Sequence, residues 1–132
     1  MGNIDANLIK NLAEKYGLSL VVLFGSQATG ATHAGSDTDI AFFSERPKNM
    51  REIAEMQMEF STAFRIKNLE LVDLAGKTPL FLKQVADEGV KLYEKDPSVF
   101  DEFRIYAFKR YVEARPLYAL RKAQLQTFLQ TI

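Results

Sequence analysis

The chain has 132 residues and a mass of 15.0 kDa, enough for one domain, or for one domain with a helical extension. Seventeen Lys and Arg residues balance seventeen Asp and Glu residues, so the global positive charge typical of nucleic-acid-binding proteins is missing. Cysteine is absent, which excludes disulfides and thiolate metal sites, and the sequence shows no signal-peptide pattern or membrane-spanning apolar stretch. We therefore expect a cytoplasmic protein that does not contact a membrane.

Helical and strand patterns alternate along the first 96 residues. Asp5 and Gly17 are typical of the start and end of a helix between them. A continuously apolar run over residues 18–24 predicts a buried strand. Further along we expect a short helix over about 26–31, strands over 37–44, 69–74 and 90–93, and helices over about 49–64 and 79–89. This order predicts an α/β fold in which a short, mixed sheet is flanked by helices.

The sequence changes character after Asp96-Pro97. Residues 98–114 form a helical pattern rich in aromatic residues, and Pro116 is expected to break or kink it before a final helix that reaches about Gln130. The aromatic spacing predicts an apolar face that packs either on the chain's own domain or on another protein. Basic residues cluster here and could frame an interface with an acidic partner, whereas direct nucleic-acid binding is less favoured. The clustered residues are Arg104, Lys109, Arg110, Arg115, Arg121 and Lys122. We expect a domain over 1–96 and a helical extension over 97–132.

Three carboxylates stand at or within predicted strands. Asp37 and Asp39 lie on one face of a strand, about 7 Å apart, because side chains alternate along an extended chain. Two neighbouring carboxylates repel each other unless a cation lies between them, and oxygen ligands of this kind suit Mg²⁺. Asp73 interrupts another apolar strand and could supply a third ligand, although an Asp at a strand end can also face solvent or cap a turn.

A Gly-Ser turn precedes the carboxylate pair. Gly25-Ser26 follows the first strand and offers backbone N–H groups and a hydroxyl that suit a phosphate, while Ser36 stands directly before Asp37. The turn is not a Walker A loop, because Ala31 occupies the position at which that motif needs Lys. The two features together predict a site for Mg²⁺ and a nucleoside triphosphate.

Gly25-Ser26, ten further residues and then Asp37-x-Asp39, with a later Asp73, resemble the DNA polymerase β-type nucleotidyltransferase superfamily. More narrowly, residues 18–94 are similar to its minimal (MNT) branch, whose members are usually encoded beside a HEPN-domain partner as antitoxin and toxin. The resemblance implies that Gly25 and Ser26 hold the β- and γ-phosphates. Ser36, a turn residue that supports Asp37, is a further candidate for phosphate binding. The resemblance also implies that Asp37 and Asp39 ligate two Mg²⁺ ions and that Asp73 completes the ligand shell of the catalytic ion.

The resemblance further implies a reaction and a partner. The reaction would transfer AMP from ATP to a hydroxyl, a tyrosine in particular, of a cognate HEPN ribonuclease toxin bound as a hetero-oligomer. One alternative is an antitoxin that only masks its toxin, because Thr29 stands where the family often has Arg before the loop's closing glycine. Another alternative is a nucleotidyltransferase for small molecules, which ranks last because such enzymes generally carry an additional substrate domain.

Overall fold

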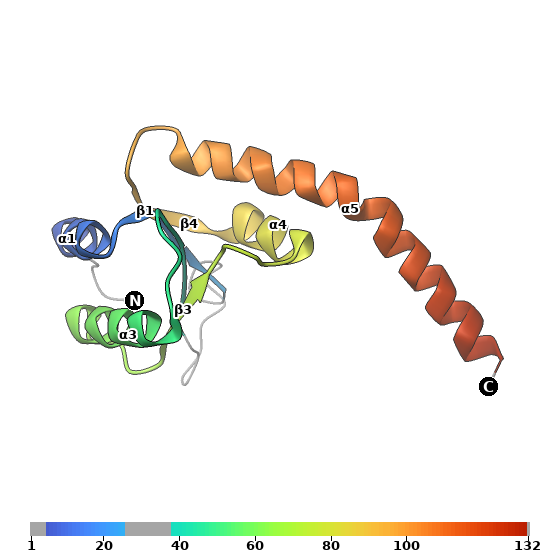
Figure 1. Cartoon of the computed structure of the whole chain (residues 1–132), viewed down its shortest axis with the longest axis horizontal. Coiled ribbons are helices and arrows are strands. Elements are labelled where there is room, and N and C mark those ends of the chain that lie inside the picture. Colours follow the sequence, from blue (N-terminus) through green and yellow to red (C-terminus); the bar gives the residue numbers. More distant parts are fainter. Residues whose placement is uncertain (1–4, 26–37, 132) are drawn as a thin grey trace.

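The computed structural model describes residues 5–25 and 38–131 of the chain. The expected fold class, a mixed α/β sheet with flanking helices and a C-terminal helical arm, is confirmed (Figure 1). The elements in chain order are α1 (Ala6–Tyr16), β1 (Leu18–Phe24), β2 (Thr38–Ser44), α3 (Met50–Phe64), β3 (Leu69–Asp73), α4 (Pro79–Glu88), β4 (Val90–Glu94) and α5 (Val99–Gln130). Among the described residues, no helix combines the length and the hydropathy needed to cross a bilayer.

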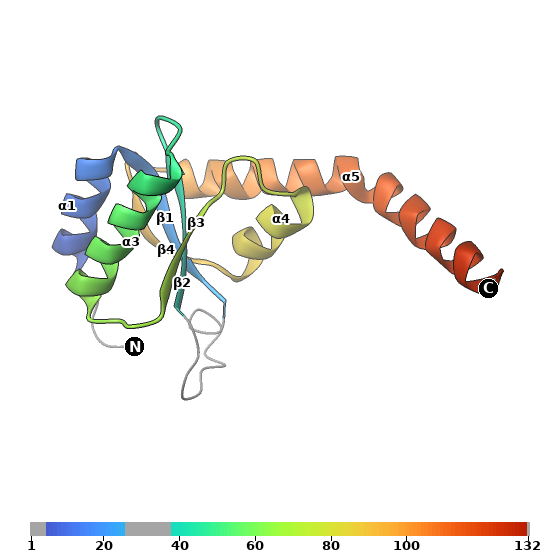
Figure 2. The same cartoon turned by 60° about the horizontal axis from the view of Figure 1, so that its bottom comes forward.

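The four strands form one sheet in the order β3-β2-β1-β4. Strand β1 is antiparallel to both of its neighbours, whereas β2 and β3 are parallel. Because of these directions, the end of β1 meets the beginnings of β2, β3 and β4 at one end of the sheet. Figure 2 shows the sheet with helices on both sides of it. This shared end brings together chain segments that are far apart in sequence.

Two hydrophobic clusters attach the helices to the two faces of the sheet. On one face, α1 and α3 pack through side chains that include Ala13, Met56 and Phe60. On the other face, α4 and the beginning of α5 pack through side chains that include Val85 and Phe103. A register shift between Leu18 and Leu20 sends these two side chains to opposite faces, which strict alternation would not allow. Beyond the shift, β1 and β2 present alternate residues to the two clusters, whereas in β4 the consecutive residues Leu92 and Tyr93 pack against the same cluster.

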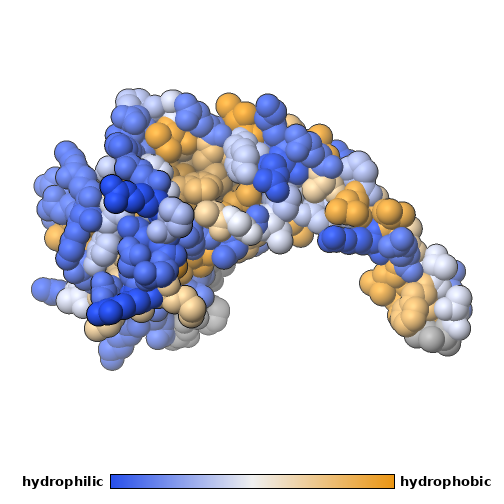
Figure 3. All heavy atoms as spheres, in the orientation of Figure 1, coloured by the Kyte–Doolittle hydropathy of each residue, from blue (hydrophilic) through white to orange (hydrophobic). Residues whose placement is uncertain are grey.

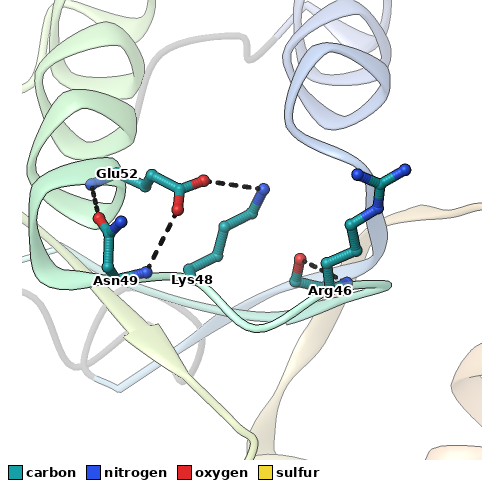
Figure 4. A network of polar contacts seen from close by, with 5 residues as sticks. Arg46, Lys48, Asn49 and Glu52 are labelled. Carbon is teal, nitrogen blue, oxygen red and sulfur yellow. Dashed lines mark hydrogen bonds and ion pairs between the residues drawn. The ribbon is translucent and has the colours of Figure 1, made fainter.

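Helix ends follow the local sequence signals. The Asp5 side chain accepts a hydrogen bond from the Asn7 N–H, and Gly17 ends α1 in the left-handed conformation at φ 66°. Figure 4 shows the corresponding start of α3, where Asn49 and Glu52 each accept a hydrogen bond from the other's backbone N–H. Lys48 lies beside this capping box, 3.6 Å from the Glu52 carboxylate. These caps fix how α1 and α3 lie against the sheet.

The interface of α1 and α3 contains a polar network away from the shared sheet end. Lys15 contacts Glu59 at 2.5 Å, and this hydrogen bond lowers the pKa of the Glu59 carboxyl below its usual value. Burial raises the pKa of Tyr16 to about 12, with a further contribution from its hydrogen bond to Glu59. Neither group lies near the catalytic candidates, so the network serves the fold.

Helix α5 is continuous over 32 residues and contains Pro116. Of the two outcomes expected at this proline, a break or a kink, the helix shows the kink, which agrees with its change of direction in Figure 1. Val112, four residues before the proline, is exposed, so water can bond the carbonyl that Pro116 leaves without a donor. The helix can therefore bend there and continue.

Candidate active site

The candidate site lies at the sheet end where β1 finishes and β2 and β3 begin. Phe24 and Asp39 are direct partners on the antiparallel strands β1 and β2. The Phe24 ring contacts the Phe81 ring of α4 edge-on, with centroids 5.7 Å apart, which anchors the end of β1 immediately before Gly25. The Asp39 side chain points to the opposite face of the sheet from Ile40 and to the same face as Ala41, which belongs to the hydrophobic cluster beneath α4 and α5. Asp39 is therefore held on a rigid strand, on the face covered by α4 and α5.

Gly25 meets two requirements that another residue would not. Its φ of 80° lies in the left-handed region, which costs side-chain-bearing residues about 1–2 kcal/mol. A Cβ built on Gly25 would lie 2.7 Å from Oδ2 of Asp39, closer than real Cβ contacts come. The missing side chain thus leaves room for the Asp39 carboxylate against the backbone. Gly25 and Asp39, both predicted from sequence as site residues, are brought together by the structure.

Glu70 is the second carboxylate at this end of the sheet. The parallel register pairs Asp39 of β2 with Glu70 of β3, and neighbouring strands lie about 4.8 Å apart. Directly paired residues point to the same face of a sheet, so the two carboxylates share a face. Glu70 is exposed, which leaves its carboxylate open to a ligand. Glu70 is not among the site residues predicted from sequence, although a charge between two apolar residues, Leu69 and Leu71, was a visible signal.

Asp73 does not join the pair. Its partner on β2 is Phe42, and it lies three residues, or about 10 Å, further along β3 than Glu70. Because side chains alternate between the two faces of a sheet, a separation of three residues places Asp73 on the opposite face from Glu70. Its carboxylate accepts a hydrogen bond of 3.0 Å from the Ala75 N–H, which stabilises the turn after β3. The register therefore does not support the expectation that Asp73 completes the carboxylate set. The turn-capping interpretation, also open from sequence, matches its contacts.

Three other predicted site residues, Ser26, Ser36 and Asp37, lie outside the described residues, as does the expected short helix over 26–31. The described part of the site supplies oxygen ligands only, from Asp39 and Glu70, beside a glycine with no side chain. This donor set fits Mg²⁺, which prefers carboxylate oxygens and shares them with phosphates. The site is thus suited to metal-assisted chemistry on a phosphate ester or anhydride.

Comparison with known proteins agrees with the class of enzyme that this geometry indicates. The family described as "Polymerase beta, Nucleotidyltransferase" matches residues 7–98, so the chain belongs to this family of nucleotidyltransferases. The chain is 28% identical to the protein adenylyltransferase MntA of Aphanizomenon flos-aquae, over 86% of this chain and 81% of that protein. It is 29% identical to the protein adenylyltransferase MntA of Shewanella oneidensis, over 63% of this chain and 60% of that protein.

Solved structures share the fold over almost the whole chain. A crystal structure of a toxin–antitoxin with AMP-PNP matches with a TM-score of 0.76 and 25% identity, over 96% of this chain and 99% of that one. The complex of the tri-AMPylated Shewanella oneidensis HEPN toxin with its MNT antitoxin matches with a TM-score of 0.69 and 23% identity, over 94% and 95%. Because the matched region covers 96% of this chain, it extends well into α5, and the C-terminal helix therefore belongs to the shared fold.

Proposed function

We propose that this chain is an Mg²⁺-dependent protein adenylyltransferase that transfers AMP from ATP to a hydroxyl, in particular a tyrosine hydroxyl, of a cognate HEPN ribonuclease toxin. It thereby acts as the antitoxin in a hetero-oligomeric pair. The observation that carries the proposal is that the Asp39 carboxylate occupies the space that a side chain on Gly25 would fill, with Glu70 as the strand partner of Asp39. Family membership and the two adenylyltransferase relatives support the same reaction.

The proposed metal ligands are Asp37, Asp39 and Glu70, with Glu70 in the role first expected for Asp73. Two Mg²⁺ ions bound there would polarise the α-phosphorus and neutralise the departing pyrophosphate. Gly25 and Ser26 are proposed to bind the β- and γ-phosphates through backbone N–H groups and a hydroxyl, with Ser36 next to Asp37. The register of Asp39 with Glu70 supports this assignment, because both carboxylates share one face without moving the backbone.

The chemical step needs an acceptor oxygen, a leaving group and a base. The acceptor hydroxyl oxygen attacks the α-phosphorus of ATP, the bond from that phosphorus to the oxygen bridging to the β-phosphorus breaks, and pyrophosphate leaves. The hydroxyl proton passes to a carboxylate at the sheet end. Glu70 is the proposed base, because it is exposed beside Asp39 and can meet a hydroxyl that arrives from outside the domain.

A second candidate function is neutralisation by binding alone, with a weak nucleotide site. Thr29 favours it, since a cation missing from the phosphate loop lowers affinity for a triphosphate. The exposed carboxylate at position 70 argues for catalysis, because a chain selected only for binding gains nothing from two adjacent negative charges. We propose a cytoplasmic setting for either function, which the absence of cysteine permits.

Label transfer tests the proposal. The purified chain would be incubated with α-³²P-ATP, Mg²⁺ and the HEPN protein encoded beside it, in parallel with Asp39→Asn and Asp73→Asn variants. We expect a labelled HEPN band with the wild type and with Asp73→Asn, and none with Asp39→Asn or after chelation of Mg²⁺. If the Asp39→Asn variant labels its partner at the wild-type rate, the proposed site is incorrect. If the partner binds without being labelled by any variant, the binding-only function is correct.

A further inference from the structure

Helix α5 extends beyond the domain as an arm. We define the arm as residues 117–131, which follow Pro116 and would span about 22 Å at 1.5 Å per residue. Figure 1 shows it leaving the domain beyond α4, and every residue from 119 to 131 is exposed. A helical segment of this length without tertiary contacts is marginally stable in water. The arm is therefore expected to gain its stability from a binding partner.

The arm carries an apolar stripe that continues the buried face of α5. Phe103 and Ala107 are buried against the sheet and α4, and the same face passes through Ala114 at helical spacing. Beyond Pro116 this face presents the residues that we call the arm stripe: Leu117, Tyr118, Leu125, Phe128 and Leu129. Four of them are 48–58% exposed, and Figure 3 shows apolar atoms gathered along the arm. An amphipathic helix whose apolar side faces water is typical of a docking surface.

The charge of α5 indicates what kind of partner would cover the stripe. Residues 104–132 contain six Lys or Arg and a single acidic residue, Glu113, whereas residues 1–103 contain eleven basic and sixteen acidic residues. Arg121 lies in the middle of the arm stripe, between Leu117 and Leu125 on the same face. Pairing of two arms would bring like charges together, so the distribution favours a different protein with acidic side chains around an apolar groove. A contact between the arm and the acidic domain of a second copy would be head-to-tail, and light scattering on the free chain would detect it.

The arm also lies on the appropriate side of the sheet. Helix α5 packs on the face that carries Ala41 and Leu74, and Asp39 and Glu70 point to this same face. A protein substrate needs contacts outside the chemical site, because one hydroxyl-bearing side chain offers little binding surface. A partner held by the arm stripe would therefore be on the side from which the carboxylates are reached.

We propose that the arm stripe is the docking surface for the HEPN protein that the chain modifies, and that this protein offers an apolar groove with an acidic rim. The inference rests on the proposed function, since it assigns a surface to the partner named there. Docking through the arm holds the acceptor hydroxyl near Asp39 and Glu70, so the arm acts as a positioning element without taking part in the chemistry. Its loss should raise the KM for the HEPN protein and leave the KM for ATP unchanged.

The test compares two double variants of the arm. Leu125→Glu with Phe128→Glu places two charges in the stripe, whereas Gln126→Glu with Gln130→Glu adds the same charge on the opposite side of the same turns. All four side chains are exposed, so both variants should fold, which circular dichroism would check. Binding to the purified HEPN protein would be measured by calorimetry, with Asp39→Asn in every chain so that transfer does not change the partner. AMP transfer would be measured separately, with active chains.

We expect the stripe variant to bind at least a hundredfold more weakly and the control to stay within threefold of the parent chain. Equal binding by the two variants would overturn the inference, as would failure of the parent chain to bind the HEPN protein at all. Light scattering on the free chain adds a further check, because a dimer that only the stripe variant dissociates would assign the stripe to a second copy. Intact docking without AMP transfer by the active chain would refute the proposed function and leave the docking surface standing.

Discussion

Substitution of Glu70 by Gln should reduce AMP transfer while leaving the fold at least as stable. Asp39 and Glu70 lie opposite each other on strands whose backbones are about 4.8 Å apart, and two like charges at a similar separation in water repel each other by at most about 1 kcal/mol when no metal lies between them. Removing one charge should therefore raise the free energy of unfolding of the metal-free chain by up to that amount. Losing a metal ligand and base should slow transfer by about 100-fold or more, equivalent to about 2.7 kcal/mol in the activation free energy.

Asp73→Asn is the matched control for this prediction. The Asn side-chain oxygen can still accept the hydrogen bond from the Ala75 N–H, so stability should change by less than about 0.5 kcal/mol and transfer by less than about threefold. Urea unfolding without Mg²⁺ and initial rates of label transfer would measure both quantities. The reasoning fails if Asp73→Asn abolishes transfer while Glu70→Gln remains active, because the register of β2 and β3 would then not decide which carboxylate serves the site.

Two further outcomes follow from the contacts of the fold. Gly25→Ala should lower the free energy of unfolding by about 1–2 kcal/mol, because alanine is strained at this left-handed φ, and its Cβ should displace the Asp39 carboxylate. Urea unfolding and label transfer should both show losses. An active, fully stable variant would contradict the 2.7 Å distance between the added Cβ and Oδ2 of Asp39. The pKa of Tyr16 is raised from 10 to about 12 by folding, so between these values the unfolded chain loses this proton and the folded chain keeps it. The free energy of unfolding should therefore be unaffected by Tyr16 below pH 10 and decrease between about pH 10 and 12. In Tyr16→Phe this decrease should be smaller in pH-dependent unfolding, and an identical pH profile would exclude Tyr16 as its source.

Much of the fold followed from local signals in the sequence. The helices begin and end where capping residues predict, as at Asp5, Gly17 and Asn49, because these residues satisfy the free backbone groups of a helix end. The strands were recognised by their apolar runs. The sequence left open whether Pro116 breaks or kinks α5. The helix continues with a kink, because a proline removes one hydrogen bond and the exposed side of the helix tolerates this loss by bending.

The candidate site was predictable only in part. Asp39 beside Gly25 followed from the spacing of the motif, which keeps a turn and a strand start together. The choice between Glu70 and Asp73 depends on which residue of β3 stands opposite Asp39, and sequence alone does not give the register between two strands. Asp73 drew attention because it interrupts an apolar strand, yet its carboxylate caps the following turn. The sequence left open whether the aromatic face of residues 98–114 packs on the chain's own domain or on another protein, and the structure shows Phe103 buried but Phe108 exposed.

Intact-mass spectrometry of the HEPN partner tests the central claim most directly. The partner would be co-expressed with the wild-type chain or with Asp39→Asn, purified, and weighed. The account predicts that the partner gains mass in whole units of AMP with the wild type, that fragmentation places them on a hydroxyl-bearing residue, and that the Asp39→Asn chain leaves the mass unchanged. A partner of unmodified mass in both preparations, bound to a folded wild-type chain, would contradict it.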